Sequence, residues 1–393
     1  MGSHKTLYCA LAGIGTGIAL YLFSRPKRFT PHTIPLRGAQ NCKYILDNSH
    51  SHTFTLSDGR KLGYADYGNR EGKPILYQHG IPGSRIEATR YHDLGIELGL
   101  RIIAIDRPGY GWSTPFKEYG ARSVKTWAED VNALTDHLKL SEYAVMVHGL
   151  PRISTTLPKK KRTDTHQGVS GGGPYALSLA HSLPADKLKA VCLICGIGPR
   201  DIGMSGAGWP TYLGFTIGWR FSPAVLLKWY FQLDPALSLA LSDEERIRLL
   251  LSPDRLKGMS DEDRMLFADE DEMRVYVASS RASFAQGYDG MCKDGYALCT
   301  DWGFGIEDVT KDVPVVLWYG AQDLNVPPGH GRATAARLRT GAEQGDGEIA
   351  EKGPVEWRER VRLRILEDTH ASVVGRDKMG YLVEILNAWG KGA

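Results

Sequence analysis

Short continuous apolar runs alternate along the chain with longer segments in which apolar residues recur every three or four positions. The apolar runs predict buried strands over residues 74–78, 101–105, 143–147, 190–195, 313–319 and 361–366. The periodic segments predict helices near 88–98, over 123–138 and 174–183, and from about 381 to 389. Residues 53–68 are typical of a hairpin around an Asp-Gly turn. Strands that alternate with helices predict an α/β fold with a mostly parallel central sheet and helices on both faces.

Residues 199–312 interrupt this alternation, because they are helix-like throughout and rich in aromatic side chains. Such an insert over the carboxyl ends of the strands is expected to form a helical cap. The core is then expected in two parts, 53–198 and 313–393. The aromatic residues either form the cap's own core or line a pocket. Residues 341–356 form a long, polar and glycine-rich stretch. This composition predicts a surface loop, or an anomalous insert like the one described below for residues 147–167.

The N-terminal residues 7–23 carry no charged side chain. The length of this run is at the short end of the range for a membrane span. Three basic residues follow this run within 25–28, against only Lys5 before it, so the positive-inside tendency places the downstream domain in the cytosol. We therefore predict an anchor or targeting segment over 1–28 and a linker over 29–52. A cleaved signal peptide of a secreted protein and a soluble cytoplasmic N-terminus remain alternatives.

The composition of the chain limits the kinds of function that it can have. The 393 residues, 42% of them hydrophobic, suit one large α/β domain with an inserted subdomain. The net charge of +3 gives no electrostatic argument for nucleic-acid binding. The six cysteines show no paired framework, and Cys192 and Cys195 lie in an apolar run as expected of core residues. No cluster has metal-ligand spacing, so neither a metal nor a cofactor is expected; the oligomeric state is not indicated.

A G-x-S-x-G pattern, from Gly168 to Gly172, lies between the apolar run 143–147 and the predicted helix 174–183. Glycines allow the sharp strand-to-helix turn that exposes a serine as a nucleophile, so Ser170 is the candidate. The N–H of the following residue, Gly171, would stabilise an oxyanion. Ile81, in the His-Gly-Ile-Pro loop after an early strand, would donate the second N–H.

The candidate acid and base also follow predicted strands. Asp323 comes after the run 313–319, and His370 comes after the run 361–366. Loops at the carboxyl ends of parallel strands meet at one edge of a sheet, so these side chains can converge on Ser170. Asp201 is an alternative acid, and His330 is an alternative base.

These motifs together resemble the α/β-hydrolase superfamily over residues 53–390. The resemblance rests on the His-Gly-x-Pro loop at His79, the Asp-Arg-Pro-Gly-Tyr-Gly-x-Ser loop at Asp106, the elbow at Ser170, and the order Ser, Asp, His. It implies an α/β-hydrolase fold with an inserted helical cap and a catalytic triad of Ser170, His370 and Asp323. It also implies that His79 is structural.

A serine at the elbow favours acyl chemistry, because the superfamily's dehalogenases and epoxide hydrolases use an aspartate there. The resemblance therefore implies an esterase or lipase-like enzyme that acts on a small-molecule acyl substrate. The aromatic cap and the predicted anchor favour a lipophilic carboxylic ester. An aminopeptidase-like amidase is one alternative, and a hydrolase fold that binds a ligand without turnover is another.

Residues 147–167 do not fit this scheme. Removing them joins Met146 directly to Gly168, which restores a continuous run from strand to elbow. The removed segment has no helical or strand period and contains the basic run 159–162. A valine codon begins with GT and a glutamine codon can end with AG, so we hypothesise an unspliced intron. As real protein, the segment must loop out of the sheet and could displace Ser170.

Overall fold

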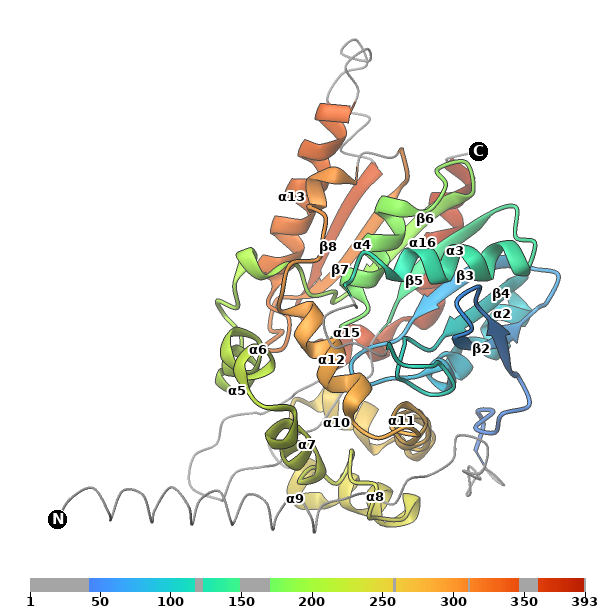
Figure 1. Cartoon of the computed structure of the whole chain (residues 1–393). Helices are drawn as coiled ribbons and strands as arrows, with labels where there is room; N and C mark the ends of the chain where they lie inside the picture. The colour runs from blue at the N-terminus through green and yellow to red at the C-terminus, as the bar shows by residue number, and fades with distance from the viewer. Residues whose placement is uncertain are drawn as a thin grey trace.

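The computed structural model describes residues 42–116, 123–148, 170–256, 259–309, 312–345 and 360–391 (Figure 1). Eight strands form one sheet in the order β1-β2-β4-β3-β5-β6-β7-β8. Their bounds are β1 Ser51–Thr55, β2 Lys61–Gly68, β3 Lys73–Gln78, β4 Leu100–Ile105, β5 Tyr143–Val147, β6 Leu188–Ile194, β7 Val315–Gly320 and β8 Val361–Leu366. Strand β2 pairs antiparallel with β1 and β4, and the other pairs are parallel. The predicted hairpin and mostly parallel sheet are confirmed.

Both faces of the sheet are covered, because each strand sends alternate side chains to opposite sides. On β4, Ile103 and Ile105 pack into one apolar cluster, whereas Ile102 and Ala104 pack into the other. The first cluster includes side chains of α3 (Trp127–His137), α4 (Gly173–Ser182) and α13 (Pro328–Gly345). The second includes side chains of η1 (Arg85–Tyr91), α15 (His370–Arg376) and α16 (Lys378–Lys391). The helix α2 (His92–Glu97) packs on β2 and β4.

The segment between β6 and β7 is helical. Its elements are η2 Arg200–Ile202, α5 Trp209–Leu213, η3 Gly214–Gly218, α6 Trp219–Phe221, α7 Ala224–Gln232, α8 Asp243–Leu250, α9 Pro253–Leu256, α10 Asp261–Ala268, α11 Glu270–Ser283, α12 Asp289–Leu298 and η4 Ile306–Asp308. Helices α5 to α12 lie together beyond one end of the sheet (Figure 1), whereas η4 packs against α13. Side chains of α7 and α12, among them Phe231 and Leu298, join the same apolar cluster as α3 and α4. This continuity attaches the helical segment to the core.

Several expected boundaries were wrong. The helix expected over 88–98 is a 3-10 turn, η1, followed by the short α2, and the helix expected from 123 begins at Trp127. The surface loop expected over 341–356 is helical for its first five positions, because α13 continues to Gly345; the remainder lies outside the described residues. Within the described ranges, no helix is both long and apolar enough to cross a bilayer. Residues 7–23, the predicted anchor, lie outside those ranges.

Candidate active site

Ser170 lies where β5 leads into α4. Its backbone forms an isolated parallel bridge with Gly196, beyond the end of β6. The carbonyl oxygen of Ser170 accepts the N–H of Gly173 at 3.1 Å and the N–H of Ile197 at 3.4 Å. These bonds place Ser170 in line with the sheet immediately before the helix begins, as a strand-to-helix elbow requires. Its side chain is fully buried.

The residue after Ser170 must be glycine, because the chain passes very close to its neighbours there. A Cβ on Gly171 would lie 2.7 Å from Cγ2 of Ile81 and 3.2 Å from Cδ1 of Leu298. A Cβ on Gly173 would lie 2.6 Å from Cα of Gly196. The structure therefore brings the two residues with candidate oxyanion donors, Ile81 and Gly171, into contact beside Ser170. Leu298, at the end of α12, packs against Gly171 as well.

Asp323 and His370 form a hydrogen-bonded pair. Nδ1 of His370 donates to Oδ2 of Asp323 at 2.7 Å, and both side chains are buried. The other oxygen of Asp323 accepts the N–H groups of Asn325 at 2.7 Å and Val326 at 2.8 Å, which fixes the carboxylate. With its proton on Nδ1, a neutral His370 presents Nε2 as a proton acceptor.

Two buried atoms of this site lack hydrogen-bond partners. In the part of the chain that the structure describes, neither Oγ of Ser170 nor Nε2 of His370 has one. A buried polar atom without a partner is costly and calls for an explanation in a folded protein. A bound substrate, or a hydrogen bond between these two groups, would satisfy both.

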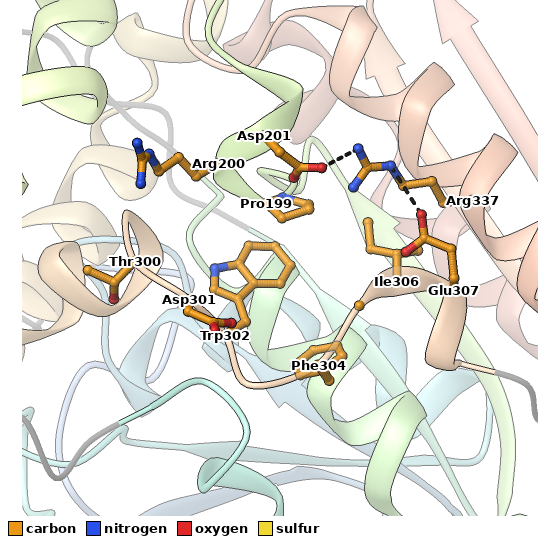
Figure 2. A pocket seen from close by; sticks show the side chains of 11 residues that line it. Pro199, Arg200, Asp201, Thr300, Asp301, Trp302, Phe304, Ile306, Glu307 and Arg337 are labelled. Carbon is orange, nitrogen blue, oxygen red and sulfur yellow. Dashed lines mark hydrogen bonds and ion pairs between the residues drawn. The ribbon is translucent and has the colours of Figure 1, made fainter.

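The alternative acid and base have other partners. Asp201 is exposed and pairs with Arg337, whose Nε also lies 3.4 Å from Glu307. Figure 2 shows this pair at one side of an open pocket of about 580 Å³, with Arg200 directed away from it. His330 is buried, and its Nδ1 accepts the N–H of Gly198 at 3.0 Å. The hydrogen bond to Asp323 is made by His370 instead.

The His-Gly-Ile-Pro loop is held by its own histidine and by a buried arginine. Nδ1 of His79 donates to the carbonyl oxygen of Gly80 at 2.8 Å, and its Nε2 accepts the N–H of Arg107 at 3.2 Å. The Arg107 guanidinium donates to the carbonyl oxygens of His79 and Gly80 at 2.6 and 2.8 Å. His79 thus has the structural contacts that the resemblance implies, and it positions the loop that carries Ile81.

Cys195 belongs to this site, which the sequence did not indicate. It follows β6 with a backbone φ of +50°, and its Sγ lies with a carboxylate oxygen of Asp323 and a ring nitrogen of His370 within 4.8 Å of one another. Burial, and then the Asp323 carboxylate, raise the pKa of Cys195 well above its ordinary value. The protonated thiol donates to that carboxylate and does not fit the thiolate that a metal site needs. The interpretation of Cys195 as an ordinary strand residue was incomplete.

A second, smaller cavity adjoins the elbow. It has a volume of about 200 Å³, and its walls include Ile197, Met204, Phe215 and Leu298, with His330 and Arg200 as charged or titratable members. Ile197 is bonded to the backbone of Ser170, and Leu298 lies against Gly171. Burial lowers the pKa of His330 to about 4, so its imidazole is neutral near pH 7. The cavity therefore combines aliphatic and aromatic walls with polar ones and contains one cation.

The first residue of the segment expected to be extraneous is part of the sheet, and the second is buried beside it. Val147 pairs with Gln78 on β3 and with Leu193 on β6. His148 is buried, and its Nε2 donates to the carbonyl oxygen of Val374 at 2.6 Å. Residues 149–169 lie outside the described residues.

No family model matches the chain. Among curated proteins, a non-heme chloroperoxidase of Streptomyces lividans is 32% identical over 148 residues, which cover 37% of this chain and 45% of that protein. A bifunctional esterase/perhydrolase of Acinetobacter calcoaceticus is 26% identical over 37% of this chain and 44% of its own. A probable proline iminopeptidase of Leptolyngbya boryana is 33% identical over 21% and 25%. The chain thus spans less than half the length of these relatives.

Solved structures match over most of the chain. A structure from a study of carboxylesterases of Nitrososphaera gargenis has a TM-score of 0.51 at 16% identity, and it covers 87% of this chain and 100% of that one. A hydrolase of Pseudomonas aeruginosa has a TM-score of 0.50 at 17% identity and covers 86% and 99%. At such identities the likeness concerns the fold. Together with the sheet order, these likenesses show that the chain has the α/β-hydrolase fold.

Proposed function

We propose that the protein is a serine hydrolase that cleaves a lipophilic carboxylic ester through an acyl-enzyme. The observation that carries the proposal is the 2.7 Å hydrogen bond between Asp323 and His370, together with the buried Oγ of Ser170 and Nε2 of His370, neither of which has a partner among the described residues. An orienting acid, a histidine with a free acceptor and a serine at an elbow are the parts that acyl transfer needs.

In the proposed reaction, Oγ of Ser170 attacks the acyl carbonyl carbon while Nε2 of His370 takes its proton. The N–H groups of Ile81 and Gly171 stabilise the oxyanion, and Asp323 stabilises the imidazolium. His370 then returns the proton to the leaving alcohol. Water, deprotonated by His370, then attacks the acyl-enzyme; the bond to Oγ of Ser170 breaks, His370 returns the proton to Oγ, and the carboxylic acid is released.

The cavity beside the elbow supports a lipophilic acyl group. Its volume of about 200 Å³ and its aliphatic and aromatic walls suit a short or branched apolar chain. Ser170 is fully buried, so a substrate reaches it only after a local movement of the protein. A hydrophobic site closed to water also favours transfer to the serine before hydrolysis.

A fluorophosphonate probe tests the proposal directly, because it labels only an activated serine. We expect the full-length protein to be labelled and Ser170→Ala to be unlabelled. Ser182→Ala, which changes an exposed serine at the end of α4, is the matched control and should be labelled like the wild type. Equal labelling of wild type and Ser170→Ala would overturn the assignment.

Hydrolysis of an N-terminal amide is the second candidate, favoured by the similarity to a probable proline iminopeptidase. An aminopeptidase must bind a protonated amine, which calls for a carboxylate beside the nucleophile. The described residues that line the cavity near Ser170 include none, and Arg200 gives it the opposite charge. An ester substrate is therefore the better proposal. Turnover of aminoacyl anilides but not of aliphatic p-nitrophenyl esters would reverse this order.

A binding protein without turnover is the remaining alternative. It would follow if the segment that directly precedes Ser170 in the chain keeps the serine from its catalytic position. If the probe labels neither the full chain nor a variant that lacks residues 147–167, the fold serves binding alone. Labelling of the shortened variant only would assign the loss of activity to the segment.

For localisation, we propose that residues 7–23 anchor the protein with its hydrolase domain in the cytosol. The charge-free apolar run and the basic residues of 25–28 support this proposal. Extraction of cell membranes with alkaline carbonate should leave the protein in the pellet. Release into the supernatant, or a mature protein that starts beyond residue 23, would favour the soluble or the secreted alternative.

A further inference from the structure

One stretch of the helical segment, from Trp209 to Leu233, carries most of the large apolar side chains that the described residues expose. We call these exposed side chains the cap patch: Trp209, Tyr212, Leu213, Ile217, Phe221, Val225, Leu226, Trp229 and Leu233. They belong to α5, η3, α6 and α7 and to the turns between them. Figure 1 shows α5, α6 and α7 along one edge of the molecule, away from the sheet.

The cap patch is large for a surface that faces only water. Phe221 exposes 65% of its surface, Ile217 55% and Trp209 47%. An aromatic side chain offers roughly 150–250 Å², so the four exposed aromatic residues alone present about 400 Å². Monomeric soluble proteins rarely expose more than a few hundred Å² of contiguous apolar surface without a binding role. The cap patch is therefore a candidate interaction surface.

Helix α7 is apolar on both sides. Leu227 and Phe231 face inward and are buried, whereas Leu226 and Trp229 are exposed. A helix that faces water on one side normally carries polar residues there, and one that is apolar all round is covered by protein or lipid. The inner contacts account for one side of α7 only.

The charge of this stretch is entirely positive. Residues 202–233 contain no aspartate or glutamate, and their cations are Arg220 and Lys228. Lys228 pairs with Asp289 at 2.6 Å. Arg220 makes no ion pair within the described part of the chain, and its guanidinium lies 5.0 Å from the centre of the Phe221 ring. Exposed tryptophan and tyrosine beside a cation without an acidic partner, here Arg220, are typical of the boundary between an anionic bilayer and water.

The length of the chain is compatible with this partner. The predicted anchor ends at residue 23, and Cys42 is the first described residue. Fully extended, residues 24–41 span no more than about 60 Å. An anchored protein would thus keep its folded domain within that distance of the bilayer.

We propose that the cap patch docks into the interfacial region of an anionic phospholipid bilayer. Docking buries the exposed aromatic and aliphatic side chains among headgroups and upper acyl chains and brings Arg220 to the lipid phosphates. The inner side of the same stretch lines the cavity beside Ser170, through Phe215 and Thr216. The bilayer would then lie against the wall of that cavity. Binding itself does not depend on catalysis.

The test must separate the cap patch from the predicted anchor. We therefore use the full-length chain with Ile14→Arg and Ile18→Arg, which interrupt the apolar run 7–23, and vesicles of phosphatidylcholine with a minor share of phosphatidylserine. Co-flotation should persist in this background and fall at least about tenfold on adding Ile217→Ser, Phe221→Ser and Trp229→Ser. Ile96→Ser, Met265→Ser and Val383→Ser change exposed apolar side chains elsewhere and should leave flotation unchanged.

Tryptophan fluorescence gives an independent measurement. In vesicles of dibrominated phosphatidylcholine, the emission of Trp209 and Trp229 should be quenched. The fraction of emission that is quenched should therefore be larger in wild type than in Trp209→Ser/Trp229→Ser. Absence of quenching, or equal flotation of the patch and control variants, would overturn the proposal. A lipid-free dimer that the patch variant dissociates, with flotation unaffected, would also overturn it in favour of contact between two copies of the chain.

Discussion

At the scale of single residues, two buried histidines lie near the proposed nucleophile, and their hydrogen bonds give them opposite chemistry. His370 donates from Nδ1 to Asp323, so its Nε2 can accept a proton. His330 accepts at Nδ1 from Gly198, so its proton is on Nε2. Burial lowers the pKa of His330 to about 4, and it stays neutral near pH 7. It can therefore donate a hydrogen bond to a substrate in the cavity but has its proton in the wrong place to serve as the base.

We expect His330→Phe to lower kcat/KM for short esters about tenfold through KM, because it removes one hydrogen-bond donor from the cavity. His370→Ala should instead lower kcat by about a thousandfold or more, because the proton acceptor is lost. Steady-state kinetics on p-nitrophenyl esters separate the two effects. A loss of kcat in His330→Phe as large as that in His370→Ala would show that the roles are exchanged.

At the scale of elements, one buried carboxylate joins the helical segment to the core. Asp294, on α12, accepts hydrogen bonds from Nη2 of Arg107 at 2.8 Å, from the hydroxyl of Tyr110 at 2.9 Å and from the hydroxyl of Tyr175 on α4. Arg107 also holds the carbonyl groups of the His79 loop. The position of α12, and with it Leu298 over the elbow, therefore depends on this cluster.

Asp294→Asn should lower the free energy of unfolding by about 3–5 kcal/mol, because it leaves the buried Arg107 without its charge partner. Asp289→Asn is the control on the same helix, since its partner Lys228 is partly exposed, and it should cost less than about 1 kcal/mol. Urea unfolding measures both. Equal small losses in the two variants would mean that α12 is held by apolar contacts alone.

The second prediction at this scale concerns β5. A variant that lacks residues 147–167 would place Gly168 and Val169 directly after Met146, in the positions that Val147 and His148 now occupy. His148 lies near the rings of Tyr77, Tyr91 and Tyr381, so an apolar valine suits that site. We expect the shortened protein to fold and to react with the fluorophosphonate probe about tenfold faster or more, because a continuous strand fixes Ser170.

Transcript sequencing and the shortened variant test the same hypothesis from two sides. If most mature messages encode residues 147–167, the segment is real protein and not a retained intron. An insoluble shortened variant, beside a labelled full-length chain, would show that the segment is needed by the fold.

At the scale of the whole molecule, buried titratable groups set how stability depends on pH. Burial raises the pKa of Glu87 to about 8, although Arg90 and the hydroxyl of Tyr77 oppose the shift. Burial lowers the pKa of His148 to about 3 and that of His330 to about 4. Both histidines destabilise the fold as pH falls below about 6.5, because the unfolded chain then binds protons that the folded chain does not.

Glu87 acts in the opposite direction. The unfolded chain loses this proton near its ordinary pKa of 4.5, whereas the folded chain keeps it to about pH 8. Stability is therefore full below pH 4.5 and falls as pH rises to 8, by up to about 1.4 kcal/mol per pH unit. Glu87→Gln imitates the neutral form, so its melting temperature relative to wild type should rise from pH 4.5 to 8 and then level off.

Glu272→Gln is the control of opposite sign. Despite burial, Arg90 and Lys378 lower the pKa of Glu272. Its contribution is present above pH 4.5 and is lost in acid, so the variant should be destabilised most at neutral pH. A difference between Glu87→Gln and wild type that stays constant with pH would mean that Glu87 is ionised in the folded protein.

Much of the fold could be predicted because the strands are continuous apolar runs. The runs at 101–105 and 143–147 match β4 and β5 within a residue, since strands buried on both faces are nearly continuous apolar runs. The extension of α13 to Gly345 was missed, because polar residues and glycine at the end of a helix resemble those of a loop. The sequence predicted η1 and the short α2 as one helix, because the two elements are consecutive and carry similar periodic patterns.

The sequence alone determined the fold class and the nucleophile candidate, because apolar runs and glycine spacing are local properties of the chain. Only the tertiary structure decided that His370 and not His330 bonds Asp323, that Asp201 is taken by Arg337, and that Cys195 lies against the acid. These pairings join residues far apart in the chain, so no local pattern specifies them. The same holds for the cap patch, since the pattern that marks a helix apolar does not say which of its sides the protein covers.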